Sequence, residues 1–489
     1  MVGPKYQRPV AVTPPALKEL AGNDQWKVAT PSDGLIKGKW WEMFGDLELN
    51  RLEELVSVNN QNVKFAEAQF RQARALVSAN HANYYPIIGS TPGITQGDTG
   101  QNATGKKGAG GTAQSFNLGA AASWEPDFWG RVRLSVENAT DNAQSDAATI
   151  QNVLLAQQAL LATDYFALAA NDMQEAVLKE SIEAYQKNLQ LTQDRFRFGV
   201  ASKSDVSLAQ TQLLGATAEA TDLHVARAQF EHAIAMITGQ APASLSIEPT
   251  KIAAPPPPIP VAVPSTLLER RPDIAATERL VAAANANVGI AEAAYYPTLT
   301  LTASAGFLSN SLANLFTYAS RDWASGANIS QTLFDFGRRG AALQGVQAAY
   351  DATAATYRQT VLGAFQEVED DLAGLRYLAE EAGQQDDTVK AAQESLSLEL
   401  DRYKAGTDSY LNVITTQNIA LSDELTAVAI LQRRMAAAID LVKAVGGGWD
   451  NTNLPSTDAL RAASVRDQKN TPYPKATPIS PLKPIADAK

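Results

Sequence analysis

The sequence predicts a mostly helical fold that is built from two similar halves and carries a small β part long enough to cross a membrane. The first observation is a repeated stretch, because Arg195–Gln210 recurs as Arg402–Gln417. The same shift of 207 residues carries Gly130 onto Gly337, so the halves keep register without an insertion. A period this long indicates a duplicated domain half, since solenoid repeats are only about 20–50 residues long. The second observation is a pair of alternating, strand-like stretches, one in each half.

Composition excludes several classes of function. The 489 residues carry a net charge of −11, which argues against nucleic acid as a partner because phosphate binding requires a basic face. Cysteine is absent, so the chain has no disulfide, thiol nucleophile or thiolate metal site. The histidines His81, His224 and His232 do not form a metal-binding pattern, and we expect no metal site and no cofactor. The sequence contains no run of about 18 apolar residues, so it predicts no membrane-spanning helix. The polar, proline-rich start indicates a mature or trimmed chain without a signal peptide.

The order of these patterns predicts five segments. They are an extended N-terminal segment at 1–45, a first repeat at 46–250, a proline-rich linker at 251–266, a second repeat at 267–449 and a C-terminal tail at 450–489. Within the first repeat we expect a helix from about Asp46 to Asn83, a β-hairpin at 84–130, a long helix at 131–198 and a return helix at 202–239. Within the second repeat we expect a helix, a β-hairpin at 295–337, a long helix at 338–405 and a return helix at 408–446.

The two long helices have no proline and no turn cluster, and 68 residues at 1.5 Å each give a helix of roughly 100 Å. Apolar residues in the second one step by four and three, at Tyr350, Ala354, Tyr357, Val361, Ala364 and Val368. Such spacing predicts left-handed supercoiling against neighbouring helices. Each return helix ends at a glycine, Gly239 or Gly446, as expected of a helix C-terminus.

The hairpins alternate in polarity. Leu299, Leu301, Ala303, Ala305 and Phe307 fall on every second position, and small or polar residues lie between them. This pattern predicts a strand with one apolar and one polar face, and arms of about ten residues are long enough to cross a bilayer. Four strands cannot close a barrel, so other copies of the chain would have to complete it.

Three further patterns have ordinary explanations. Gly100–Lys106 matches part of a phosphate-binding loop, but Lys107 stands where a magnesium-binding Ser or Thr is needed, which favours an exposed loop. The segment Glu367–Asp401 holds eleven acidic residues against two basic ones, and forms either a solvated outer face or the lining of a water-filled, cation-favouring tunnel. A ligand cage is less favoured than packing or an interfacial aromatic belt for the tryptophans Trp40, Trp41, Trp124, Trp129 and Trp449.

Several motifs occur in a characteristic order: VGPKYQRP, WWEMFGD, two YYP, EPDFWGR and LFDFGRR, FGVAS, LLERRPDI and GGGW. Together they resemble the outer-membrane efflux protein family (TolC/OprM-like), in particular its NodT-type lipoprotein branch that serves RND-type pumps. The resemblance implies a homotrimer with a 12-stranded outer-membrane β-barrel, four strands per chain, and a coiled-coil barrel of helices as a periplasmic tunnel. It implies a periplasmic adaptor, an inner-membrane RND transporter and outer-membrane lipid as partners. It also implies a lipidated cysteine just before Met1, which this chain does not contain.

The function that the resemblance implies is a passive exit duct for small molecules, in a multidrug efflux pump of the outer membrane. The alternatives within the same fold are an exit duct for secreted protein or for metal cations. A purely structural coiled-coil protein is disfavoured by the two alternating hairpins. An enzyme is disfavoured because no nucleophile, base and orienting residue form a recognisable set.

The resemblance also assigns site residues. We expect the adaptor to contact the periplasmic tip, formed by Phe198, Gly199, Val200, Ala201 and Ser202 and by Ala405, Gly406, Thr407 and Asp408. We expect the gate on the first turns after Gly406, with Leu411 as an apolar plug and uncharged Asn412 and Thr415 where some relatives carry aspartate. An acidic ring at Asp205 or Asp408 is the alternative.

Overall fold

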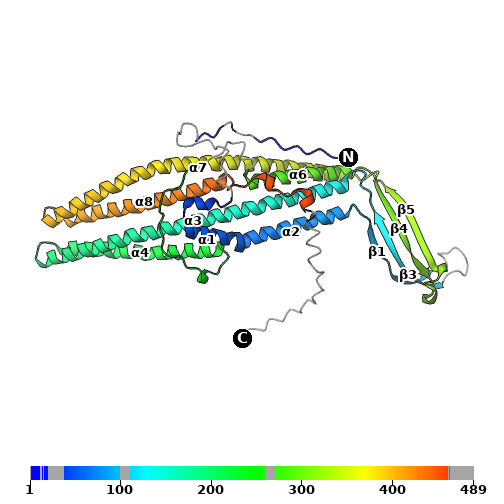
Figure 1. Cartoon of the computed structure of the whole chain (residues 1–489), viewed down its shortest axis with the longest axis horizontal. Helices are drawn as coiled ribbons and strands as arrows, with labels where there is room; N and C mark the ends of the chain where they lie inside the picture. Colours follow the sequence, from blue (N-terminus) through cyan, green and yellow to red (C-terminus); the bar gives the residue numbers. More distant parts are fainter. Residues whose placement is uncertain are drawn as a thin grey trace.

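The computed structural model describes residues 2–11, 14, 16–19, 38–99, 111–259, 270–460 and 462. The molecule is elongated, with its helices along the long axis and a tilted β-sheet at one end (Figure 1). The predicted loop at Gly100–Lys107, part of the linker and most of the C-terminal tail lie outside the described residues.

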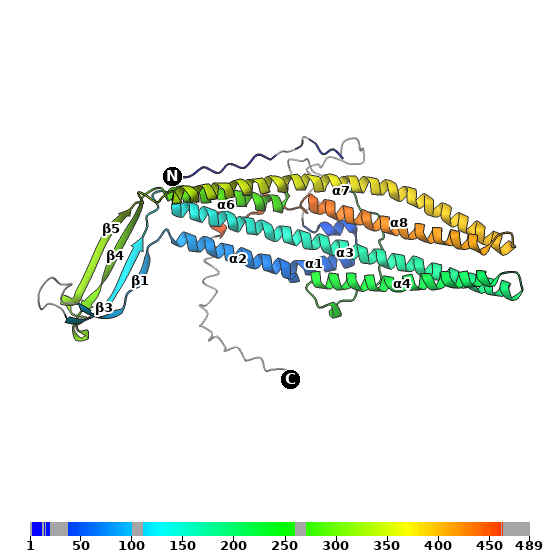
Figure 2. The same cartoon turned by 180° about the vertical axis from the view of Figure 1, so that it is seen from behind.

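Each half contributes one very long helix and shorter helices that pack along it (Figures 1 and 2). The first half contains the 3-10 helix η2 (Trp40–Phe44), α1 (Leu47–Asn59), α2 (Gln61–Ala82), α3 (Arg131–Arg197), α4 (Lys203–Ile237) and η4 (Pro242–Ser244). The second half contains α6 (Pro272–Ala293), α7 (Arg338–Ala405), α8 (Tyr410–Ala444) and η7 (Asn451–Asn453). Helix α4 runs back along α3, and α8 runs back along α7, as the duplication requires.

Glycine starts both long helices. Gly130 and Gly337 precede α3 and α7 with the same positive φ of 88°, a conformation that costs a glycine little. An aspartate before each helix satisfies the first backbone N–H groups, because Asp127 accepts from Val132 at 2.9 Å and Asp335 accepts from Arg339 at 3.2 Å. The long helices therefore begin at equivalent points of the two halves.

The prediction of one helix from Asp46 to Asn83 is wrong at Asn60. This residue leaves the helical conformation, with ψ at 128°, and separates α1 from α2. Its side-chain oxygen accepts from the N–H groups of Asn62 and Val63 and so caps the start of α2. Its Nδ2 donates to the carbonyl of Ile237 at 2.8 Å, which fixes the break against the end of α4.

The core lies along the seam of the long helices. Tyr357, Val361 and Val368 of the predicted 3.5-residue seam are almost completely buried. Leu161, Tyr165 and Leu168 of α3 belong to the same cluster, which also takes in α1, α4 and α8. Part of α3 is apolar enough to cross a membrane by length and composition, but most of that window is buried inside the protein, as in a core helix.

The sheet is antiparallel, and its strands follow the order β1-β3-β4-β5. Strand β2 also pairs with β3. The strands are β1 (Ile87–Ser90), β2 (Gly93–Thr99), β3 (Gly111–Trp124), β4 (Thr298–Ser309) and β5 (Arg321–Ser330), with η5 (Leu312–Asn314) and η6 (Tyr318–Ser320) between the last two. Trp124 pairs with Leu301, and Trp323 pairs with Ala305, so large apolar side chains share one face with the alternating residues of β4. Small residues such as Ser123, Thr302 and Gly326 line a hollow of about 480 Å³ on the sheet.

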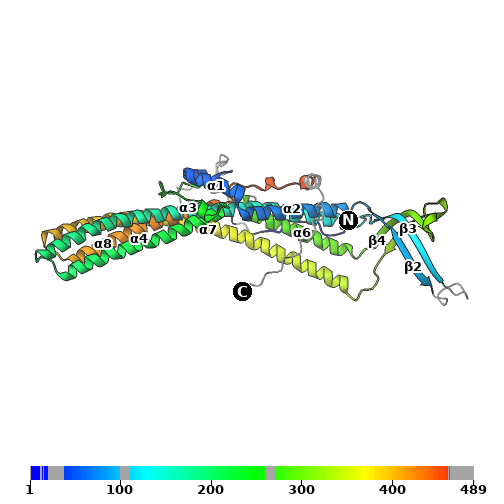
Figure 3. The same ribbon diagram turned by 90° about the horizontal axis from the view of Figure 1, so that it is seen from below.

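The first and last parts of the described chain pack on the helices near the sheet. The N-terminus lies beside the start of α3, where the N–H of Val2 donates to the carbonyl of Trp129 at 3.2 Å. Leu460, near the end of the described chain, is buried against Ala73, Val77, Ala139 and Ala143 of α2 and α3. Figure 3 shows α2, α6 and α7 reaching the sheet end, while α4 and α8 occupy the opposite end.

Candidate functional site

The tip farthest from the sheet is formed by two helix reversals. In the first, α3 ends at Arg197 and Gly199 takes a φ of +74°, which allows the chain to turn into α4. Phe198 and Val200 flank this glycine and are 84% and 64% exposed. Two large apolar side chains therefore face solvent at this turn.

The side chain of Asp205 takes part in capping the start of α4. Ser202 and Asp205 form a capping box, in which the Ser202 hydroxyl accepts from the N–H of Asp205 at 3.1 Å. In return, the Asp205 carboxylate accepts from the N–H of Ser202 at 2.8 Å. Ala201 joins this cap to the preceding turn, because its N–H donates to the carbonyl of Arg195.

The second reversal is more polar. Helix α7 ends at Ala405, and Gly406 takes a φ of +80°. The Thr407 hydroxyl donates to the carbonyl of Arg402 at 3.0 Å. Hydrogen bonds from the backbone of Ser409 and the Asn412 amide, both at 2.7 Å, hold the pKa of Asp408 below its ordinary value. Asp408 is therefore ionised and already hydrogen-bonded.

The three expected gate residues lie on one exposed face at the start of α8. Leu411 is 58% exposed, and Asn412 and Thr415 are exposed beside it. The Thr415 hydroxyl donates to the carbonyl of Leu411 at 2.9 Å. Tyr410 and Val413 occupy the opposite face of the same turn and are buried. The structure therefore brings the expected gate residues together on one face, where apolar Leu411 lies beside uncharged Asn412 and Thr415 and the Asn412 amide donates to Asp408.

A link between the two halves at the tip was not expected from the sequence. Arg195 of α3 donates from Nη1 to the carbonyl of Tyr403 at 2.6 Å, and its guanidinium lies 4.5 Å from the centre of the Tyr403 ring. The Tyr403 hydroxyl in turn contacts Thr192 at 3.3 Å. Arg195 and Arg402 occupy the same position of the repeat, so the sequence contains no signal that only the first binds the other half.

The acidic side chains of the segment Glu367–Asp401 have different surroundings. Glu369 accepts from the N–H groups of Lys18 and Glu19 at 2.7 and 2.9 Å and holds the N-terminal segment on α7. Burial raises the pKa of Asp371 to about 7. No group of three or more His, Cys, Asp or Glu side chains in the described part of the chain is arranged to hold a metal ion.

The tryptophans do not form a common cage. Trp40 and Trp41 are buried and meet edge to face, with ring centres 5.8 Å apart. Trp129 stacks on Tyr296 where the helices join the sheet, and its Nε1 donates to the carbonyl of Pro297 at 2.7 Å. Trp124 donates likewise to the carbonyl of Tyr84 at 3.0 Å. Trp124 and Trp129 therefore stabilise the junction between the helices and the strands.

Known proteins share this architecture. The family model of outer membrane efflux proteins matches residues 53–240 and 263–447 of the chain. Over 455 residues the chain is 31% identical to a probable efflux pump outer membrane protein, TtgC, of Pseudomonas putida, and the match covers 91% of this chain and 92% of that protein. It is 28% identical over 458 residues to a probable outer membrane lipoprotein, SilC, of Salmonella typhimurium, with 92% and 95% covered.

A solved structure of a channel protein has a similar fold. The outer-membrane channel OprN superposes with a TM-score of 0.85 at 27% identity, and the match covers 92% of this chain and 99% of that one. The two long helices, the two hairpins and the tip reversals therefore belong to a known channel fold. The chain belongs to the outer membrane efflux protein family and is an outer-membrane channel of an efflux pump.

Proposed function

We propose that this chain forms, as a homotrimer, the passive exit duct of a tripartite RND-type pump that exports small molecules such as drugs. The observation that carries the proposal is the placement of two exposed helix reversals at one end and a sheet with one apolar face at the other. A duct between two membranes requires a membrane-embedded part, a spanning part and a docking tip, and the sheet, the long helices and the reversals are suited to these three roles.

The sheet supports the trimer. Its outer strands, β1 with β2 on one side and β5 on the other, have no further partner among the described residues. Unpaired strand edges cannot remain in lipid, because no water is present to satisfy their backbone groups. Three copies would pair these edges and close twelve strands, with the apolar face toward lipid and the small residues toward the lumen.

The tip supports docking to a periplasmic adaptor. Phe198 and Val200 expose apolar surface at the end of α3, and Thr407 lies at the equivalent reversal of the second half. Cysteines placed at Val200 and Thr407 should form crosslinks to the adaptor protein in cells. Crosslinks only to surface reagents outside the cell would mean that the chain runs in the opposite direction.

The exposed face of α8 supports a gate that closes by apolar contact. In a trimer, three Leu411 side chains would meet around one axis, and a narrow apolar constriction resists wetting. Asn412 and Thr415 add no charge to this face. The duct should therefore be blocked only weakly by divalent cations.

Planar-bilayer recordings test the gate. Leu411→Ala should raise the single-channel conductance, because it removes the apolar plug. Thr415→Asp should introduce strong block by Mg²⁺, because three carboxylates would then face one another. Strong Mg²⁺ block of the unmodified channel would place an acidic constriction elsewhere and refute the assignment.

We also propose an N-terminal lipid anchor in the natural protein, on a cysteine that precedes this sequence. The position of Val2 beside Trp129 supports this, since it places the N-terminus at the sheet end, where an acyl chain can enter the membrane. The similarity to a lipoprotein, SilC, supports it as well. Cells that express the full gene should incorporate labelled palmitate into the protein.

A further inference from the structure

A cavity of about 410 Å³ opens at the sheet end of the helices, among α2, α3, α6 and the segment after η7, which contributes Thr457. His81 and Tyr84 line it just before the chain enters β1, so the cavity lies directly next to the sheet. Arg133, Glu137 and Asp141 of α3 and Arg279 of α6 supply its charged groups. None of these residues belongs to the tip or the gate.

Arg133 is the anomaly in this cavity. Its backbone N–H donates to Asp127, but its guanidinium donates no hydrogen bond and forms no ion pair with any residue that the structure describes. One of its nitrogens, Nη2, is buried without a partner. A buried donor without an acceptor is unfavourable, and a guanidinium suits the paired oxygens of a phosphate or carboxylate. The guanidinium of Arg133 can therefore donate to an anionic group that enters the cavity.

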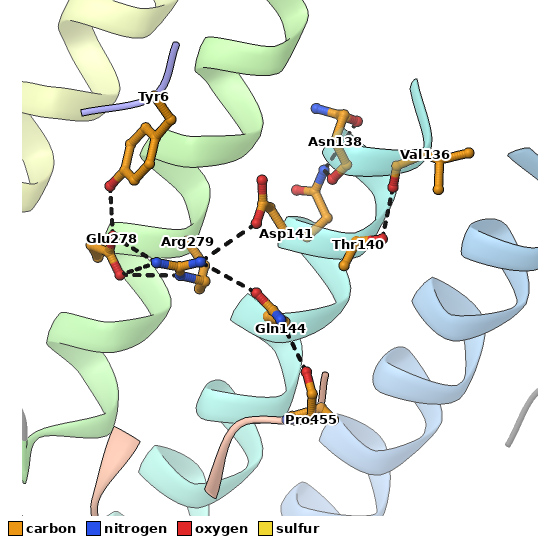
Figure 4. A network of polar contacts seen from close by, with 10 residues as sticks. Tyr6, Val136, Asn138, Thr140, Asp141, Gln144, Glu278, Arg279 and Pro455 are labelled. Atoms are coloured by element: carbon orange, nitrogen blue, oxygen red, sulfur yellow. Dashed lines mark hydrogen bonds and ion pairs between the residues drawn. The ribbon is translucent and has the colours of Figure 1, made fainter. Parts of the chain in front are cut away.

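Arg279 can donate to the same group. Its Nη2 is held by Glu278 at 2.7 Å, but Nη1 lies 3.7 Å from Asp141 and 3.4 Å from Gln144, which are loose contacts (Figure 4). Burial raises the pKa of Asp141 to about 7. Near neutral pH this carboxyl is partly protonated, so it repels an incoming anion less than an ordinary aspartate would.

The duplication supplies an internal comparison. The shift of 207 residues carries Arg133 onto Gly340 and Asp141 onto Ala348. Helix α7 starts at the equivalent point and packs along α6 without either charged group. The duplicated helix start therefore does not by itself require an arginine at position 133, although α3 packs along both α2 and α6 and α7 packs along α6.

We propose that the cavity binds the head group of a zwitterionic phospholipid, with its phosphate on Arg133 and Arg279 and its ammonium on Glu137. Glu137 is exposed one helical turn beyond Arg133 and forms no ion pair among the described residues. The proposal rests on the proposed function, which places the sheet in the outer membrane and therefore the cavity at the inner leaflet. A bound lipid of this kind would fix the depth of the channel in the membrane.

Native mass spectrometry of the full chain in detergent, titrated with short-chain phosphatidylethanolamine, tests the proposal. Arg133→Gln should weaken binding about tenfold, which corresponds to ~1.4 kcal/mol. Arg338→Gln is the matched control, because it removes the same charge near the start of α7 but outside the cavity, and it should bind as the unmodified chain does. Glu137→Gln should retain binding but lose the preference for phosphatidylethanolamine over phosphatidylglycerol.

Three results would overturn the proposal. They are unchanged binding by Arg133→Gln, equal binding of a diacylglycerol without phosphate, and equally tight binding of inorganic phosphate, which would identify a soluble anion as the occupant. Failure of the duct proposal is distinguishable, since it would appear as a lack of conductance of the unmodified chain in bilayers. Lipid binding in detergent does not depend on that conductance.

Discussion

Asp141 should make the stability of this protein fall as the pH rises. The side chain lies on α3, almost fully buried, with Arg279 as its nearest charged partner at 3.7 Å. Burial is the largest influence and raises its pKa from 3.8 to about 7, although Arg279 opposes this. Because the folded chain holds a proton that the unfolded chain releases, stability is lost between about pH 4 and pH 7.

The structure sets the size of the effect. Each tenfold change in proton affinity corresponds to ~1.4 kcal/mol, so the difference between 3.8 and about 7 destabilises the folded state by roughly 4 kcal/mol at most above pH 7. Asp141→Asn removes the ionisation and leaves Arg279 paired with Glu278. The variant should therefore be more stable than the unmodified chain at pH 8 and nearly equal to it at pH 4.

Thermal unfolding followed by circular dichroism at one scan rate, at pH 4, 6 and 8, measures this difference. Asp387→Asn serves as the control, because it neutralises an exposed carboxylate on α7 and should shift the unfolding temperature equally at each pH. An unmodified chain that gains stability over Asp141→Asn as the pH rises would refute the reasoning. It would show that the ionised carboxylate stabilises the fold through Arg279.

Two further predictions concern the ends of the helices and the tip. Gly446→Ala should lower the unfolding temperature, at a cost of roughly 2–4 kcal/mol, because a Cβ at this φ of +93° would lie 2.0 Å from the carbonyl oxygen of Arg270. Gly345→Ala is the control, because this glycine lies inside α7 with open space around it, and the change should stabilise the protein by up to about 1 kcal/mol. Arg195→Gln should raise the ratio of open to closed channels about tenfold or more in bilayer recordings, because a charged hydrogen bond to the end of α7 contributes about 1.5–3 kcal/mol. An unchanged open fraction would mean that the two reversals separate without breaking this contact.

The fold class could be predicted because the duplication and the helical seam are properties of the sequence itself. An unbroken register over 207 residues is possible only if the elements between are rigid, and glycines such as Gly130 and Gly337 mark the helix starts. The helical spacing does not predict the break at Asn60, because apolar residues continue at that spacing on both sides. The signal was present, however, since asparagine is among the favoured helix N-caps.

The local chemistry of the site could be predicted only in part. The exposed face with Leu411 follows from helical spacing once the start of α8 is known. The contact of Arg195 with Tyr403 depends on how two distant helices meet, and no spacing along the chain encodes it. The same holds for the guanidinium of Arg133, whose lack of a partner appears only when α2, α3 and α6 are assembled.

The two reversals at the tip share a backbone and differ in the use of their carboxylates. The shift of 207 residues places Asp205 in the first half opposite Asn412 in the second. Asp205 binds the N–H of Ser202, and Asp408 binds the N–H of Ser409 and the side chain of Asn412. A carboxylate that already accepts such hydrogen bonds must give them up to coordinate a cation, and this cost weakens cation binding at the tip. The halves thus reach the same result by different residues, and weak block by Mg²⁺ is expected whichever reversal lines the duct.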